Sequence, residues 1–197
     1  MTKRDDQRRE TWARIVDVAV RSLVDNGYAA TTAFGVQREA GISRGALLHH
    51  FPTSEALSAA AVAKLVELNL QAVLDESART PPGPDLVARG VGVLYRASRQ
   101  PSFAAELELW AAARADEPLR AALLAAERTA LVRLYEVIDE LFGPDLRRHP
   151  RYRAMVELTV QLMRGLTVSR SLGQDGQQRA VRTWTVVLRG ALANTAP

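Results

Sequence analysis

The stretch that decides the fold is TAFGVQREAGISRGALLHHF, which runs from Thr32 to Phe51 and is called the reader below. It predicts two short helices joined by a tight turn. Gly41 supplies the backbone freedom for that turn, because a residue without Cβ enters the left-handed region at little cost. Ser43 follows as the N-cap of the second helix. Leu47 and Phe51 are four residues apart, so they share one face and pack back onto the first helix.

The opposite face of the second helix points outward. It carries Arg44, Gly45, Leu48 and His49. A short helix with a cation and a small residue near its N-terminus suits the major groove of DNA, which is wide enough to admit an α-helix. The pattern therefore favours a helix-turn-helix that reads DNA.

The run A-G-I-S-R-G-A-L-L-H-H-F resembles the helix-turn-helix signature of the tetracycline-repressor (TetR) family of bacterial transcriptional regulators. The positions that fit the signature are Thr32, Val36, Ala40, Gly41, Ile42, Ser43, Gly45, Leu47, His50 and Phe51. The motif resemblance covers about Trp12 to Leu57, and the remaining helices resemble the family in number and length. The resemblance implies a ligand-responsive regulator that binds an operator in double-stranded DNA as a two-fold dimer.

Carried over residue by residue, the resemblance gives a set of expected DNA contacts. Hydroxyls at the start of the two reader helices bind phosphate, together with the nearby N–H groups. Arg44 faces the bases and makes a bidentate contact to guanine; a phosphate contact or a solvated arginine are its alternatives. The full set is Thr32, Phe34, Gln37, Ser43, Arg44, Gly45, Leu48, His49 and Ser54.

Three residues of this set depart from the family pattern. Leu48 stands where the family usually has tyrosine, Ser54 where it has lysine, and Gln37 where it has alanine. The first two departures remove phosphate contacts, which lowers non-specific affinity and its salt dependence. Phe34 faces the groove and thymine methyl groups or else packs in the core, and His49 reaches phosphate or is a plain surface histidine.

The rest of the chain predicts an all-α protein of about nine helices. The first helix is expected to begin near Asp5 or Asp6 and to bury a face formed by Trp12, Ile15, Val16, Ala19 and Leu23. The sequence Gly143-Pro144 ends the longest helix, and another helix is expected from Phe103 to Arg114. We expect a helix-turn-helix domain at residues 1–52 and a helical effector-binding and dimerisation domain at residues 53–197.

Composition and charge exclude several classes of protein. The chain has no cysteine, so disulfides and thiolate metal sites are excluded, and its three histidines lack ligand spacing, so no metal or cofactor is expected. No paired carboxylates, nucleophile–base arrangement or glycine-rich phosphate loop indicates an enzyme. The net charge of +4 is not concentrated in the first third of the chain. No stretch has about 18 uninterrupted apolar residues, so we expect a cytoplasmic protein that does not enter a membrane.

The last two predicted helices, about Tyr152 to Leu172 and Gly176 to Leu192, have two apolar sides. Burial on two sides is typical of a helix that packs both on its own protein and on a partner. A homodimer is therefore expected, with a buried hairpin in a monomer as the alternative. The interface residues predicted are Met155, Leu162, Leu166, Val181, Trp184 and Leu188.

An effector pocket is implied by the resemblance and is placed on polar or aromatic residues among apolar helical faces. These candidates are Tyr95, Trp110, Arg114, Gln161 and Arg164. Arg114 suits an anionic ligand. Its alternatives are an ion pair to Glu106 or Glu157 and a side chain that extends along the surface into solvent. The predicted function is a repressor released from its operator by a small molecule; the alternative is a helical interaction or ligand-binding module with weak or no DNA binding.

Overall fold

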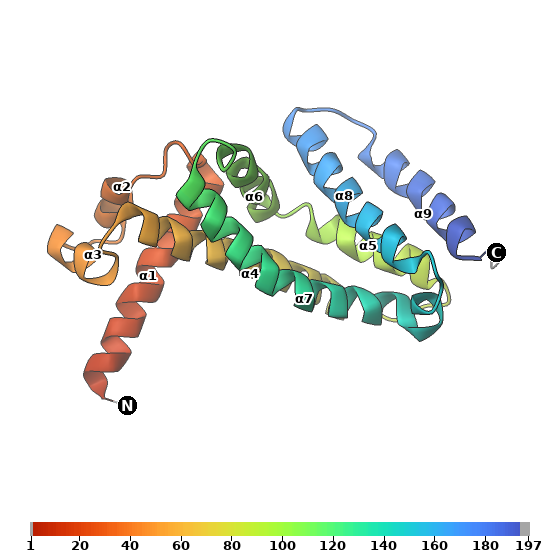
Figure 1. Cartoon of the computed structure of the whole chain (residues 1–197), viewed down its shortest axis with the longest axis horizontal. Helices are drawn as coiled ribbons and strands as arrows, with labels where there is room; N and C mark the ends of the chain where they lie inside the picture. Colours follow the sequence, from red (N-terminus) through yellow and green to blue (C-terminus); the bar gives the residue numbers. More distant parts are fainter. Residues whose placement is uncertain (1, 194–197) are drawn as a thin grey trace. The chain divides into compact units, whose positions relative to one another are not determined.

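The computed structural model describes residues 2–193 of the chain. This range contains nine α-helices and no β-strand, as the sequence predicted (Figure 1). In chain order the helices are α1 (Lys3–Asn26), α2 (Ala33–Glu39), α3 (Arg44–His50), α4 (Ser54–Arg79), α5 (Leu86–Ala97), α6 (Pro101–Ala112), α7 (Glu117–Arg147), α8 (Tyr152–Ser171) and α9 (Gln177–Ala193). The all-α fold class is confirmed.

The described residues form two compact units. Unit 1 contains residues 2–68 and 105–129, and unit 2 contains residues 69–104 and 130–193. Helices α4, α6 and α7 each contribute residues to both units. The predicted domain boundary at residue 52 lies within unit 1, and that boundary stays a prediction.

The core of unit 1 starts from the buried face of α1. Ile15, Val16, Ala19 and Leu23 recur at three- and four-residue spacing and are all buried. The other buried apolar residues of unit 1 include Val36, Ala40, Leu47, Phe51, Leu57, Ala61, Val62, Leu65, Leu109, Leu119 and Leu123. The reader thus contributes its inward-facing residues to the same unit as α1.

Trp12 corrects one expectation for α1. It was expected on the buried face, but 43% of it is exposed. Trp12 lies in the N-terminal half of α1, whose first turns extend past α2 and α3 (Figure 1). Its indole ring lies 5.9 Å from the ring of the buried Phe51, and the rest of the side chain stays accessible to solvent.

Helix α4 is long and apolar enough, by length and composition alone, to cross a membrane, and it is the one such helix among residues 2–193. Its apolar residues are used inside the protein instead. Leu57, Val62 and Leu65 are buried in unit 1, and Leu70 and Val73 are buried in unit 2. We therefore identify α4 as a core helix.

The core of unit 2 is built from α5, the second part of α7, α8 and α9. Its most deeply buried members are Val91, Val93, Ile138, Leu141, Phe142 and Leu188. The ring of Phe142 meets Tyr152 edge-on, with 6.0 Å between the ring centroids. The long helical run of α7 is interrupted at Gly143, as predicted: Gly143 has a φ of 80° and a ψ of 168°, which is not helical, and a short helical segment from Pro144 to Arg147 completes α7.

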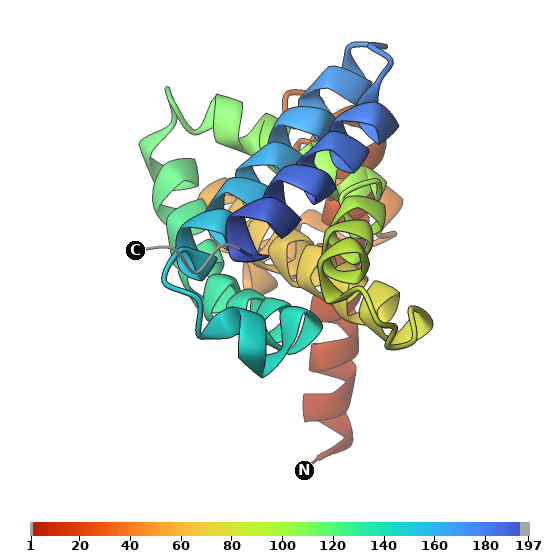
Figure 2. The same cartoon turned by 90° about the vertical axis from the view of Figure 1, so that its right-hand side faces the viewer.

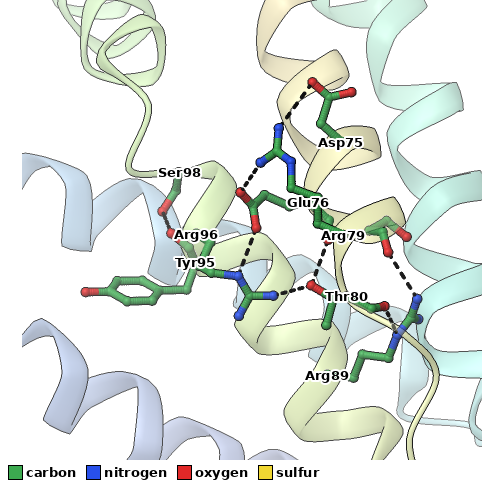
Figure 3. Close-up of polar contacts among 9 residues, drawn as sticks. Asp75, Glu76, Arg79, Thr80, Arg89, Tyr95, Arg96 and Ser98 are labelled. Carbon is green, nitrogen blue, oxygen red and sulfur yellow. Dashed lines mark hydrogen bonds and ion pairs between the residues drawn. The ribbon is translucent and has the colours of Figure 1, made fainter.

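A polar cluster in unit 2 connects the end of α4 to α5 (Figure 3). The carboxylate of Glu76 bridges two guanidinium groups, that of Arg79 at 2.7 Å and that of Arg96 at 2.9 Å. The Arg89 Nε donates to the backbone carbonyl of Thr80 at 3.1 Å. Backbone carbonyls at a helix C-terminus carry partial negative charge, so a cation is stabilising there. We interpret this cluster as a structural brace.

Gly90 on α5 is expected to be the glycine of unit 2 that is least tolerant of a side chain. A Cβ at Gly90 would lie 2.7 Å from Cζ and 2.8 Å from Cε2 of Phe142, which is 1% exposed and part of the core of unit 2. Gly90→Ala should therefore lower the free energy of unfolding by about 1–3 kcal/mol, the usual cost of overpacking a core. Urea unfolding followed by circular dichroism measures this change.

Gly92 on the same helix is the matched control. A Cβ at Gly92 would meet only the Nη1 of Arg96 at 3.2 Å, the far end of a flexible side chain. Because alanine favours a helix over glycine by about 1 kcal/mol, Gly92→Ala should be neutral or stabilising. Equal losses in the two variants would show that Phe142 does not determine the effect.

Candidate DNA-binding site

Each reader helix begins with a hydroxyl cap. The Oγ1 of Thr32 accepts the N–H of Gly35 at 3.1 Å, and the Oγ of Ser43 accepts the N–H of Ala46 at 3.1 Å. Gly41 has a φ of 65°, a backbone conformation in which a side chain would be strained. The predicted caps and the glycine turn are therefore confirmed.

The turn is also fastened by a side chain. The Nε2 of Gln37 donates to the carbonyl oxygen of Ile42 at 3.0 Å, so the amide spans the connection between α2 and α3. Gln37 is partly buried, unlike the rest of the predicted contact set. Its position in the structure indicates that it stabilises the turn, and its DNA contact stays a prediction.

The reader has a buried side and an exposed side. Val36 and Leu47 are buried on the inner side. The exposed members of the predicted set are Thr32, Phe34, Ser43, Arg44, Gly45, Leu48, His49 and Ser54. Phe34 is 70% exposed and Leu48 is 46% exposed, so the core alternative for Phe34 does not hold. The exposed side of the reader thus carries Phe34 and Leu48 together with Arg44, a composition that suits a binding surface.

Arg38 is an exposed reader residue that the sequence reasoning missed. It lies four residues after Phe34 on α2, so helical spacing alone could have placed it beside Phe34. Its neighbour Glu39 pairs with Arg21 of α1, with 3.4 Å between Nη2 and Oε1. Both side chains of that pair are more than half exposed, so the pair adds little stability.

His50 differs from His49 in its surroundings. His49 is exposed, whereas His50 is partly buried. Burial lowers the pKa of His50, and the nearby charges of His49 and Arg8 lower it further. The imidazole of His50 is therefore neutral at pH 7 and suits packing. Among residues 2–193, no three His, Asp or Glu side chains are grouped as they would be around a metal ion.

The residues predicted for the effector pocket are divided between the two units. Tyr95 and Arg164 are partly buried and Gln161 is exposed, all in unit 2; Tyr95 points away from the Glu76 cluster (Figure 3). Trp110 lies in unit 1, where its Nε1 donates to the carboxylate of Glu127. Arg114 is exposed and follows the end of α6, so it does not share a helical face with Trp110. Their ligand roles stay predictions.

The residues predicted for the dimer interface lie on the core side of α8 and α9. Leu166 and Leu188 are buried within the protomer, at 8% and 1% exposure. The other four, Met155, Leu162, Val181 and Trp184, are partly buried against the same core. The Nε1 of Trp184 donates to the Oγ1 of Thr159 at 2.9 Å and so joins α9 to α8. Periodicity found two apolar sides but could not tell the inner side from the outer.

Tyr28 links the end of α1 to α6 and α7 within unit 1. Its hydroxyl donates to the Oδ2 of Asp116 at 2.8 Å, and its backbone N–H donates to the Oε1 of Glu108 at 2.7 Å. The Oδ1 of Asp116 also accepts the N–H of Leu119 at 2.9 Å. These bonds hold the pKa of Asp116 below its usual range, with the Leu119 bond as the largest cause. The segment that precedes the reader is therefore fixed by two carboxylates.

Tyr28 should make stability depend on pH in the alkaline range. Burial, followed by the hydrogen bond to Asp116 and its charge, raises the pKa of Tyr28 to about 12. The pKa of an unfolded tyrosine is about 10, so the neutral phenol stabilises the fold fully below about pH 10, and this stabilisation is lost as the pH rises through about 12. Urea unfolding at about pH 9 and about pH 11.5 should show this loss.

Tyr28→Phe provides the comparison for this pH dependence. The variant lacks the ionising hydroxyl, so its stability should fall less steeply between the two pH values. Some decline should remain, because burial and the hydrogen bond to Asp139 also raise the pKa of Tyr152. Equal slopes for the wild type and Tyr28→Phe would contradict the assigned pKa of Tyr28.

Two short helices with hydroxyl caps are joined by a turn at Gly41, and the second helix exposes an arginine. These features define a helix-turn-helix protein. Residues 15–61 match the family described as bacterial regulatory proteins, tetR family. Over this range the chain has the helix-turn-helix of this family of DNA-binding transcriptional regulators. Regulators of this family are not enzymes, in agreement with the sequence-based prediction.

Relatives and solved structures cover most of the chain. The HTH-type transcriptional regulator CymR of Pseudomonas putida is 29% identical over 88% of this chain and 85% of its own length. An uncharacterized HTH-type regulator of Mycobacterium bovis is 25% identical over 87% of this chain and 89% of its own length. A regulator from Rhodococcus sp. Rha1 has the same fold, with a TM-score of 0.68, 17% identity and coverage of 91% and 96%. The multidrug binding protein EbrR, complexed with imidazole, has a TM-score of 0.64, 22% identity and coverage of 94% and 96%.

Proposed function

We propose that this regulator is a repressor that binds its operator as a homodimer and is released by a small-molecule effector. The observation that carries the proposal is the exposed face of α3, which begins at the cap Ser43 and presents Arg44, Gly45 and Leu48 to solvent. The N-terminal residues of the second helix are the ones that meet base edges in this motif. Arg44 is therefore assigned to base reading.

The remaining reader residues are assigned to the DNA backbone and to apolar contacts. Thr32 and Ser43 place hydroxyls and free backbone N–H groups at helix N-termini, which suits phosphate. His49 and Arg38 add positive or polar groups on the exposed side. Phe34 is exposed enough to touch the methyl group of thymine.

The proposed homodimer uses the outward side of α8 and α9, which lie side by side in unit 2 (Figure 2). Large apolar residues on this side are well exposed, among them Leu158 at 50%, Leu172 at 71% and Val186 at 64%. We define the dimer face by exposed residues of α8, its C-cap and α9: Ala154, Leu158, Gln161, Gly165 and Val168 of α8, the C-cap Leu172, and Thr183, Val186, Val187 and Gly190 of α9. Several large exposed apolar residues on the same pair of helices are typical of an interaction surface.

Similar proteins support the response to a small molecule. EbrR is described as a multidrug binding protein and has been solved with imidazole, proflavin and ethidium. A ligand that favours one conformation of the protein must lower its affinity for whatever binds the other conformation. An effector that binds the other conformation would therefore release the operator. A protein that binds chromosomal DNA is located in the cytoplasm.

A DNA titration tests the proposed function against the alternative of an interaction module with weak or no DNA binding. Fluorescence anisotropy should show tight binding to a fragment of the DNA upstream of its own gene and weaker, more salt-dependent binding to random duplex at two salt concentrations. Footprinting on the same fragment should give two half-sites about one or more helical turns apart. Equal, weak binding to all duplexes would favour the alternative.

A further inference from the structure

A partly open cavity of about 380 Å³ lies in unit 1, and none of the residues predicted for an effector lines it. Its walls come from the end of α1, the start of α2, the first turns of α4, and the α6–α7 segment. Small-molecule sites usually have volumes of about 300–1,000 Å³, so the cavity has room for a ligand. Its position beneath the reader makes an occupant of interest for DNA binding.

The chemistry of the lining selects the kind of ligand. Most of the wall is apolar, with Leu23, Leu57 and Leu119 among the largest side chains. The charged residues of the lining are two carboxylates, the exposed Glu55 and the partly buried Asp116, and the lining contains no lysine, arginine or histidine. An anion would be repelled here, and a purely apolar ligand would take water from the carboxylates without replacing its hydrogen bonds.

Both carboxylates are ionised at neutral pH. Bonds from backbone N–H groups and neighbouring hydroxyls hold the pKa of Glu55 and that of Asp116 below their usual ranges. The charge of Asp116 acts against this for Glu55, which shows that the two carboxylates interact. A positive group between like charges removes that repulsion.

Asp116 also keeps acceptor capacity for a ligand. It receives one hydrogen bond from the N–H of Leu119 and one from the hydroxyl of Tyr28. An ionised carboxylate has about four acceptor sites, so about two remain for a donor in the cavity. A ligand with a positively charged hydrogen-bond donor on an apolar body would match both the apolar wall and the two carboxylates.

We propose that the unit 1 cavity binds an organic cation, an ammonium or amidinium group on an apolar body, with Glu55 and Asp116 receiving the charge. The site reaches the reader directly, because Thr32 and Ala33 also line it. Thr32 caps α2 through its bond to Gly35, so an occupant acts on the first turn of the reader. The binding site stands on the cavity alone, whereas an effect on DNA rests on the proposed function.

Three probes of equal size and different charge test the site by isothermal titration calorimetry of the full-length protein. They are phenylbutylammonium, phenylbutanol and phenylbutanoate. A charge-assisted hydrogen bond should make the ammonium bind at least about tenfold more tightly than the alcohol, and the carboxylate should not bind. Equal affinities for the ammonium and the alcohol, or no binding of either, would overturn the proposal.

Substitutions that remove charge but keep shape locate the bound cation. Glu55→Gln and Asp116→Asn should each weaken the ammonium severalfold and leave the alcohol within about twofold. Asparagine is chosen at residue 116 because it also caps a helix and so preserves the bond to Leu119. Glu10→Gln, an exposed acid of α1 outside the cavity lining, is the matched control and should change nothing. Equal losses in all three variants would overturn the assignment to this cavity.

A DNA titration with saturating phenylbutylammonium separates the site from its effect. The affinity for the operator should fall by at least about fivefold, the lower end of ordinary coupling between sites, and Glu55→Gln should shift this response to a severalfold higher concentration of phenylbutylammonium. Cation binding with an unchanged operator affinity would overturn the effect on the reader and leave the site standing. Cation binding by a protein that binds no DNA would instead count against the proposed function alone.

Discussion

Replacing Leu158 and Val186 together by glutamate should give a folded monomer that binds a two-half-site operator about 100- to 10,000-fold more weakly than the wild type does. Both side chains are at least half exposed within the protomer, so the substitutions leave its core intact. In a dimer they would bury four unpaired charges, which is strongly unfavourable. A dimer binds its second half-site intramolecularly, and a monomer loses that advantage.

Sedimentation velocity, circular dichroism and anisotropy with the same operator measure the three parts of this result. The matched control is Leu124→Glu with Val132→Glu, two exposed apolar residues of α7 at 52% and 62% exposure that lie outside the dimer face. This control should remain a dimer with normal operator affinity. A soluble dimer after the Leu158 and Val186 substitutions would show that α8 and α9 do not form the interface.

Arg44→Ala should weaken operator binding by about 1–3 kcal/mol in each half-site and relax the preference at one base pair. Arg44 is exposed and directly follows the cap residue of α3, at the end of the helix that meets base edges. A guanidinium that pairs with guanine loses both hydrogen bonds in this variant, whereas binding to unrelated DNA should fall far less. Binding curves against the operator, its single-base changes and random duplex measure the difference.

Ser43→Ala is the companion to Arg44→Ala. It removes the bond from Ser43 to the N–H of Ala46, and with it the helix cap, so it should weaken binding to all sequences alike. If Arg44→Ala lowers the affinity for every duplex equally, Arg44 binds phosphate and the base-reading assignment is wrong. If neither variant changes any curve, α3 does not meet DNA.

The reader could be predicted from the sequence because its structure depends on neighbours in the chain. The Thr32 and Ser43 caps and the turn at Gly41 involve residues within three positions of one another, so the local sequence determines them. The exposed side of α3 followed from the same helical spacing. The Gln37 bond to Ile42 spans five residues and escaped notice, because an amide side chain has many alternative partners.

Features that join distant segments could not be predicted in this way. Trp12 has the spacing of a core residue, but α1 extends beyond the segments that could cover it. Leu188 has the spacing of either apolar side of α9, and only the packing of α5 and α8 shows that it faces inward. The cavity between Leu23 and Leu119 requires segments almost a hundred residues apart, and no local pattern announces it.

The division of unit 1 into two chain segments has a consequence for synthesis on the ribosome. Residues 2–68 emerge first, but Asp116, which accepts the hydrogen bond from Tyr28, and the buried Leu119 belong to residues 105–129 of the same unit. At about 5–20 residues per second, the 61 residues from 69 to 129 take about 3–12 s to add. During that interval residues 2–68 exist without the segment that completes unit 1. The apolar side chains that residues 105–129 later cover are then open to chaperones and to neighbouring nascent chains.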